Sequence, residues 1–119
     1  PMAGVEMQVI REGLGLSRAE LLALLNRGSA KQTASVSSVY RWEGGKDAIQ
    51  PWLEATLAEW EDAQRGIVDD LVAGLADERD VVLTIPRDGA GGFPGGYWRA
   101  VAWLVAQEVP GLRVRYTNE

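Results

Sequence analysis

Small hydroxyl and basic side chains gather between residues 35 and 46, a combination suited to contacting nucleic acid. Arginine can donate two hydrogen bonds to O6 and N7 of guanine, serine can bond to several bases, and lysine can neutralise phosphate. We expect Ser37, Ser38 and Arg41 to share the open side of a helix, with Lys46 just beyond its end. This stretch is therefore the candidate DNA-reading segment.

Two helix starts define the elements that would position these residues. Ser17 followed by Glu20 is the pattern of a capping box, in which each residue satisfies a backbone N–H of the other. Ser35 predicts a second start, for a short helix that runs to about Glu43 and ends at glycines 44 and 45. We expect an apolar line on its buried side, formed by Val36, Val39 and Trp42.

The residues around these two helices follow ordinary helix and loop patterns. Apolar residues at ragged helical spacing predict a first helix that ends at Gly13 and Gly15. The polar stretch 26–33 predicts a loop between the second and third helices. The apolar residues of the first two helices are Val5, Met7, Ile10, Leu14, Leu21, Leu22, Leu24 and Leu25.

A long helix is predicted from Pro51, since proline favours a first helical position. One set of its residues, apolar except for Gln64, repeats at 4-3-4-3-4 spacing, which is typical of a short heptad seam: Leu53, Leu57, Trp60, Gln64, Ile67 and Leu71. Val68, Val72 and Leu75 form a second apolar line. Residues 77–80 are expected to end this helix.

The remaining chain predicts a strand, a loop, a helix and a second strand. Residues 81–85 are short and β-branched, residues 88–96 are glycine-rich, and residues 97–108 have the length and apolar content of a helix. Leu112, Val114 and Tyr116 alternate with polar residues, which predicts a half-buried strand. The expected fold class is thus mainly α (α+β).

Two sequence blocks, 10–21 and 35–46, resemble the Cro/phage-repressor type of helix-turn-helix DNA-binding domain. The ending Val-x-Arg-Trp-Glu-x-Gly-Lys, from Val39 to Lys46, is the more specific of the two blocks. The resemblance implies that the helix after Ser35 is the recognition helix, whose first turn faces base edges. The resulting candidate DNA contacts are Arg18, Lys31, Gln32, Ser35, Val36, Ser37, Ser38, Tyr40, Arg41 and Lys46.

Two departures from that family concern the spacing of its two central helices. The segment 26–34 is longer than the family's tight turn, and Leu22 stands where the family favours alanine. Both departures predict a third helix that lies further from the second than in the common form. The lengthened loop, with Arg27, Lys31 and Gln32, could itself reach DNA.

The whole chain also resembles, in architecture only, anti-CRISPR-associated repressors and a related uncharacterised bacterial family. That likeness rests on a helix-turn-helix domain, a long helix and a small α/β tail that makes the dimer, with residues 95–102 matching the tail helix. We therefore expect a helix-turn-helix domain at 2–50, a connecting helix at 51–80 and a dimerisation lobe at 81–119. The candidate dimer residues are Trp60, Ile67, Leu71, Trp98, Val101, Trp103 and Val105.

Catalysis and cofactor binding are not expected. The 119-residue chain has no cysteine and no histidine, which removes thiolate sites and histidine bases. The glycine loop has Pro94 where a dinucleotide fingerprint needs its third glycine, and no Gly-Lys-Ser/Thr follows it. Asp69 and Asp70 are expected to be a solvated helix face rather than a metal site.

Charge is unevenly distributed along the chain, whose net charge is −5. Residues 51–80 hold nine acidic and two basic side chains, whereas residues 1–50 hold five and six. The local field decides whether a face can approach phosphate, so the first segment remains compatible with DNA. No membrane span and no secretory leader are predicted, and we expect a cytoplasmic protein.

Three functions remain open from the sequence. The first is a dimeric repressor that reads double-stranded DNA at an inverted repeat. The second is an antitoxin with a helix-turn-helix domain, whose acidic middle segment binds a basic toxin. The third is a protein-interaction adaptor that has kept the fold but lost DNA binding; gel shifts at low salt would separate it from the first.

Overall fold

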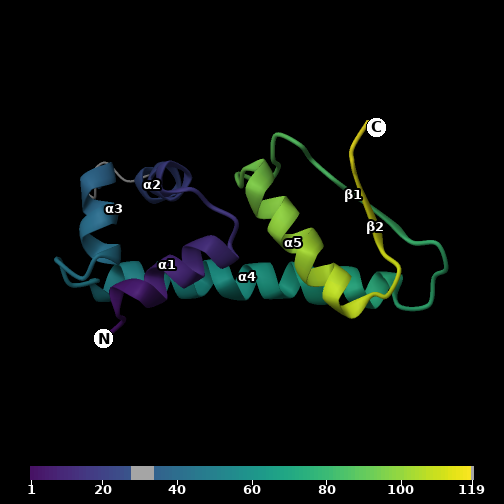
Figure 1. Cartoon of the computed structure of the whole chain (residues 1–119), viewed down its shortest axis with the longest axis horizontal. Coiled ribbons are helices and arrows are strands. Elements are labelled where there is room, and N and C mark those ends of the chain that lie inside the picture. Colours follow the sequence, from purple (N-terminus) through teal and green to yellow (C-terminus); the bar gives the residue numbers. More distant parts are fainter. Residues whose placement is uncertain (28–33, 119) are drawn as a thin grey trace. The chain divides into compact units, whose positions relative to one another are not determined.

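A computed structural model describes residues 1–27 and 34–118 (Figure 1). Within this part the protein is mainly helical, with a small two-stranded parallel sheet, as the composition and periodicity predicted. The chain divides into two compact units, residues 1–60 and 61–119, so that the long helix contributes to both. The predicted loop contacts Lys31 and Gln32 lie outside the described residues.

The first unit contains helices α1 (Gly4–Gly13), α2 (Arg18–Asn26), α3 (Val36–Glu43) and the start of α4 (Pro51–Leu75). Both predicted N-caps are present: Ser17 and Glu20 form a capping box on α2, and Ser35 and Ser38 form one on α3. Each cap satisfies N–H groups that a first helical turn leaves without partners, which explains why these helices begin where they do.

The core of the first unit gathers apolar residues from all four helices. Leu53 and Leu57, the first two members of the predicted seam, are fully buried. The other core residues are Met7, Leu14, Leu16, Leu21, Leu25, Val39 and Ile49. The interpretation of Val5 and Val36 as core residues was wrong, because both side chains are largely exposed to solvent.

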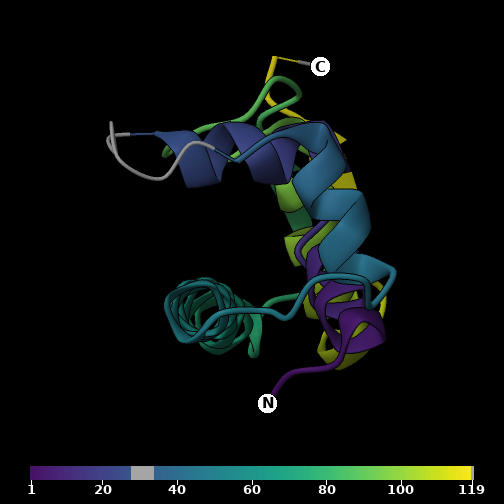
Figure 2. The ribbon, with the colours of Figure 1, turned by 90° about the vertical axis from the view of Figure 1, so that its left-hand side faces the viewer.

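Helices α2 and α3 cross at a steep angle and contact each other directly (Figure 2). The side chain of Asn26, the last residue of α2, donates to the carbonyl of Ala34 at 3.0 Å and accepts from its N–H at 2.9 Å. These two bonds join the end of α2 to the residue just before the α3 cap. The position from which α3 begins is therefore fixed by α2 itself.

Helix α1 approaches the end of α3 so closely that only glycine fits at its first position. A Cβ atom on Gly4 would lie 2.5 Å from the carbonyl oxygens of both Trp42 and Glu43. Trp42 in turn makes an edge-to-face contact with Trp52 at 6.5 Å between ring centres. The carboxyl end of α3 is thus held by α1 on one side and by the start of α4 on the other.

The second unit contains the rest of α4, strand β1 (Val82–Ile85), helix α5 (Gly95–Glu108) and strand β2 (Arg113–Tyr116). The two strands pair in parallel, with Val82 opposite Arg113 and Ile85 opposite Tyr116. A helical crossover is the usual connection between parallel strands, and α5 supplies it. Figure 1 shows the strand pair beside α5.

Three expectations for the second unit need correction. Helix α5 begins at Gly95 rather than at residue 97, with Pro94 at its N-cap. Strand β2 is not half-buried: it lies largely in solvent, and Val114 is 43% exposed. Val101 and Val105 are fully buried within their own chain, because this side of α5 packs on β1, so they cannot form a dimer surface.

Candidate nucleic-acid interface

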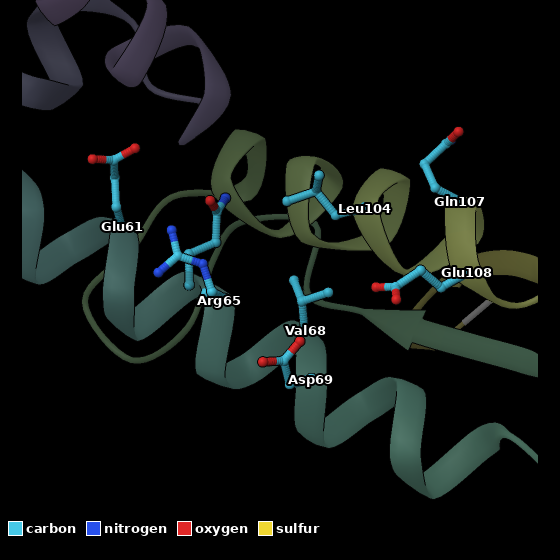
Figure 3. A pocket seen from close by; sticks show the side chains of 8 residues that line it. Glu61, Arg65, Val68, Asp69, Leu104, Gln107 and Glu108 are labelled. Atoms are coloured by element: carbon cyan, nitrogen blue, oxygen red, sulfur yellow. The ribbon is translucent and has the colours of Figure 1, made fainter.

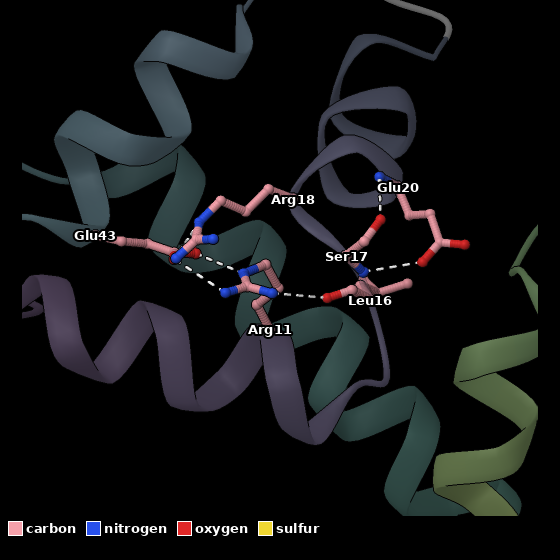
Figure 4. Close-up of polar contacts among 6 residues, drawn as sticks. All are labelled: Arg11, Leu16, Ser17, Arg18, Glu20 and Glu43. Atoms are coloured by element: carbon pink, nitrogen blue, oxygen red, sulfur yellow. Dashed lines mark hydrogen bonds and ion pairs between the residues drawn. The ribbon is translucent and has the colours of Figure 1, made fainter.

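Glu43 at the end of α3 organises the polar side of the first unit (Figure 4). Its carboxylate accepts from Nε of Arg11 at 2.7 Å and from Nη2 of the same residue at 3.1 Å. It also accepts from Nε of Arg18 at 3.1 Å, while Nη1 of Arg11 donates to the carbonyl of Leu16 at 2.9 Å. One carboxylate therefore links α1, the start of α2 and the end of α3.

These ion pairs are buried to different degrees. The side chains of Glu43 and Arg11 are 3% and 8% exposed, whereas that of Arg18 is 31% exposed. The hydrogen bonds that Arg11 donates to Glu43 raise the pKa of Arg11 above its ordinary value, against the opposing effect of burial. Since two guanidinium groups share one carboxylate, the cluster carries a net positive charge whose accessible part is Arg18.

Arg18 also fixes the position of Tyr40. Its guanidinium carbon lies 4.4 Å from the centre of the Tyr40 ring, a cation–π arrangement. Tyr40 is 56% exposed and lies one helical turn from Val36, on the same face of α3. The start of α2 and the open face of α3 thus present one continuous surface, formed by Arg18, Val36, Ser37, Tyr40 and Arg41, which we call the α3 surface.

Ser35 and Ser38 are used differently from what the sequence predicted. Their hydroxyl groups lie 3.1 Å apart, and each accepts from the backbone N–H of the other at 3.2 Å. Ser38 is half-buried, so the prediction that it shares the open side with Ser37 and Arg41 was wrong. Both serines support the start of α3, and among the three serines Ser35 and Ser37 are exposed.

Arg41 lies on the open side as expected but has a partner that the sequence did not reveal. Its Nε and Nη2 donate to Asp47 at 2.7 and 3.0 Å. The backbone N–H groups of residues 46 and 47 both donate to the Arg41 carbonyl, which folds the chain back over the end of α3. The bonds to Asp47 raise the pKa of Arg41, and those from Arg41 lower the pKa of Asp47. Lys46 is exposed beside this pair.

The predicted dimer residues are dispersed over the second unit and the end of the first. Trp103 is 64% exposed on the outer side of α5, and Trp98 is half-buried with its indole N–H donating to the Ala90 carbonyl at 3.1 Å. Trp60, Ile67 and Leu71 are half-buried along α4. Trp103 is therefore the largest apolar side chain among these that is open to solvent.

A groove of about 370 Å³ lies between the second half of α4 and α5 (Figure 3). Val68 and Leu104 face each other across it, and Glu61, Asp69 and Glu108 supply acidic groups at its rim. The described residues contain no group of three or more acidic side chains placed to hold a metal ion. None of the helices in residues 1–27 and 34–118 is long and apolar enough to cross a membrane.

The chain matches no family model, and searches of curated proteins and of solved structures return no match.

Proposed function

We propose that this protein is a sequence-specific DNA-binding transcriptional regulator, a repressor that reads an inverted repeat as a homodimer. The observation that supports it is the α3 surface, in which Glu43 and the Tyr40 ring hold Arg18 beside the open face of α3. Ser37 and Arg41 are both exposed on α3, which supports a role for them as base contacts of a recognition helix. The resemblance of segments 10–21 and 35–46 to Cro-type domains supports the same function.

The α3 surface has the chemistry that direct readout requires. Arg41 can contact guanine, Ser37 can bond to several bases, and the apolar parts of Val36 and Tyr40 can contact a thymine methyl group. Lys46 beyond the helix would neutralise a backbone phosphate. Six of the seventeen acidic residues of the chain lie on α4, outside this surface.

Selection of bound sequences from a random duplex pool tests this proposal. We expect an enriched inverted repeat whose half-sites lie about 34–36 Å apart, or a multiple of that distance, because a two-fold dimer reads one face of the duplex. A protein that enriches no sequence and binds no duplex at micromolar concentration in low salt would be an adaptor instead.

Dimerisation is the second part of the proposal and rests on the second unit. A two-stranded sheet is marginal by itself in water, and parallel sheets are usually covered on both faces. Trp103 and Val114 expose apolar surface on this unit, which a second copy would bury. Sedimentation equilibrium of the full chain should give a dimer, and Trp103→Glu should give a monomer. Val9→Glu, at an equally exposed valine of α1, is the matched control and should leave the dimer intact.

Binding of a basic protein partner, as an antitoxin binds its toxin, is a second candidate. The observation that favours it is the acidic rim of the groove between α4 and α5. A pull-down from the native host should then recover one small basic protein, and Asp69→Lys at the groove should lose it. Asp80→Lys, on an exposed turn that does not line the groove, should retain it.

A further inference from the structure

A second cavity, of about 250 Å³, lies at the carboxyl ends of the two strands. It is lined by Ile85, Arg99, Val114, Arg115 and Tyr116. Ile85 and Tyr116 are the last residues of β1 and β2, and they are paired in the sheet register. In open α/β sheets the carboxyl ends of parallel strands are the usual place for ligands. None of these residues belongs to the α3 surface.

Gly95 allows the backbone of Arg87 to lie close to Arg99, which lines this cavity. A Cβ atom on Gly95 would overlap the carbonyl oxygen of Arg87 and would lie 3.2 Å from Nη1 of Arg99. The chain leaving β1 therefore runs directly against the first turn of α5, which places Arg87 next to Arg99. A side chain at position 95 would push these two residues apart.

Tyr116 contacts both guanidinium groups. The guanidinium carbon of Arg87 is 4.0 Å from the centre of the Tyr116 ring. Nη1 of Arg99 is 3.5 Å from the Tyr116 hydroxyl oxygen, which is a long contact to a neutral group. Such a contact leaves most of the donor capacity of Arg99 available, because a guanidinium has five N–H donors.

Within the described residues, no salt bridge joins Arg99 or Arg115 of the cavity to a carboxylate. The ion pairs found in residues 1–27 and 34–118 involve Arg11, Arg18, Arg41 and Arg65, and none involves Arg99 or Arg115. Both of these arginines are exposed. Arginine binds carboxylate and phosphate in a bidentate manner, so an anion is the complementary ligand.

Beside its two arginines, the cavity has an apolar side formed by Ile85, Val114 and the Tyr116 ring. Val114 pairs with Leu83, and Tyr116 pairs with Ile85, so in a parallel ladder all four side chains point to the same face of the sheet. Leu83 and Ile85 are buried there, whereas Val114 remains 43% exposed. The volume is below that of pockets that hold drug-sized molecules. The ligand that fits is small, with one anionic group and a compact apolar body.

We propose that the cavity at the ends of β1 and β2 binds a small organic anion, a carboxylate or a phosphate monoester. Arg99 holds the anionic group, and Ile85, Val114 and Tyr116 contact the apolar body. The site is independent of DNA binding and gives the protein a small-molecule ligand in its second unit.

Titration of the full chain, followed by backbone amide chemical shifts, tests the proposal. Benzoate and phenyl phosphate are the probes, and they distinguish a carboxylate from a phosphate ligand. We expect either probe to shift the amides of Ile85, Arg99, Val114 and Tyr116, with a Kd below about 1 mM. Benzyl alcohol lacks the charge and inorganic phosphate lacks the apolar body, so each should bind at least about tenfold more weakly.

Two arginine variants locate the site. Arg99→Gln should weaken binding of the tighter-binding probe at least about tenfold, a loss of about 1.4 kcal/mol. Arg113→Gln is the matched control, because Arg113 is exposed on the same strand pair but does not line the cavity. The Kd of the same probe for the Arg113→Gln variant should be unchanged.

Three outcomes would overturn the proposal. They are the absence of shifts with 10 mM of either probe, equal binding of inorganic phosphate, and equal losses in Arg99→Gln and Arg113→Gln. The second and third would show only a general attraction of anions to a basic surface. The probe series on the unaltered chain decides the matter even where a variant does not fold, and selection of duplex DNA by the same sample tests the regulator function separately.

Discussion

Asp47 binds the side edge of the Arg41 guanidinium, through Nε and Nη2, and leaves its outer edge open. A guanidinium has five N–H donors, and these two bonds leave both donors of Nη1 and the second donor of Nη2. Bidentate recognition of guanine requires two parallel N–H donors, which the outer edge of the Arg41 guanidinium still offers. Asp47 therefore restrains Arg41 without occupying the donors that would read a base.

Arg41→Ala tests the role of this arginine in readout. Loss of a bidentate base contact should weaken binding to the selected sequence by about 1–3 kcal/mol and relax preference at one base pair in each half-site. Fluorescence anisotropy on the selected duplex and its single-base variants measures both effects. Arg65→Ala is the control, since Arg65 is also exposed and also paired with an aspartate. An equal loss of affinity for every duplex would show that Arg41 contacts only phosphate.

Asp47→Asn tests whether Asp47 holds the Arg41 side chain in place or acts only through its negative charge. If the α3 surface contacts DNA as proposed, removing the Asp47 carboxylate should strengthen binding to every duplex, because one repulsive charge is lost. Preference at the Arg41 base pair should fall at the same time, because the guanidinium is no longer held. The ratio of specific to non-specific Kd, measured at one salt concentration, reports the second effect. An unchanged ratio in a variant that still binds DNA would contradict the positioning role.

Lys46→Ala is expected to weaken binding to all sequences alike. Lys46 is exposed directly after the α3 end, where the backbone of DNA would pass. Loss of one phosphate contact should reduce the slope of log K against log salt by about one per protomer. Binding measured at several salt concentrations gives this slope. A slope equal to that of the unaltered protein would show that Lys46 is not part of the interface.

Glu43→Gln is expected to destabilise the first unit. The substitution leaves the buried guanidinium of Arg11 without a compensating charge, which costs about 3 kcal/mol in comparable cases. Urea unfolding measures the loss. Asp62→Asn, which breaks the exposed pair with Arg65, should have little effect. Equal effects of the two substitutions would show that burial of the Glu43 pair does not determine its contribution.

Tyr97→Phe should stabilise the second unit. The Tyr97 hydroxyl is buried and has no hydrogen-bond partner in the described residues, so its removal should raise the free energy of unfolding by about 1 kcal/mol. Burial also raises the pKa of Tyr97. The unfolded state therefore loses this proton first, near pH 10, and stability falls as the pH rises further. Unfolding at pH 7 and above pH 10 should show a smaller alkaline loss in the variant, whereas Tyr40→Phe at an exposed tyrosine should behave as the unaltered protein.

Local signals predicted the helix starts well. The capping box of Ser17 and Glu20 involves residues three apart, and the cap at Ser35 is equally local, so both are readable from the sequence. The start of α5 was missed because Gly95 is typical of a loop. Its place in a helix depends on the close approach of Arg87, which is eight positions away along the chain.

Contacts that depend on the tertiary fold could not be predicted in this way. Helix α5 is apolar on most of its circumference, and the sequence does not say which side β1 covers. Val101 and Val105 therefore looked equivalent to Trp103 as interface residues, although the first two are buried and the third is exposed. The Arg41–Asp47 pair likewise depends on the chain turning back after α3, and the Arg99–Tyr116 contact joins α5 to β2.

The two hydrogen bonds between Asn26 and Ala34 give the connection between α2 and α3 an evolutionary freedom that a tight turn lacks. Because this side chain joins the end of α2 to the residue just before the α3 cap, the anchor of α3 does not depend on the length of a connecting loop. Lengthening such a loop costs little, about 0.6 kcal/mol for each doubling. Residues inserted between Asn26 and Ala34 therefore need not move α3 from its anchor on α2.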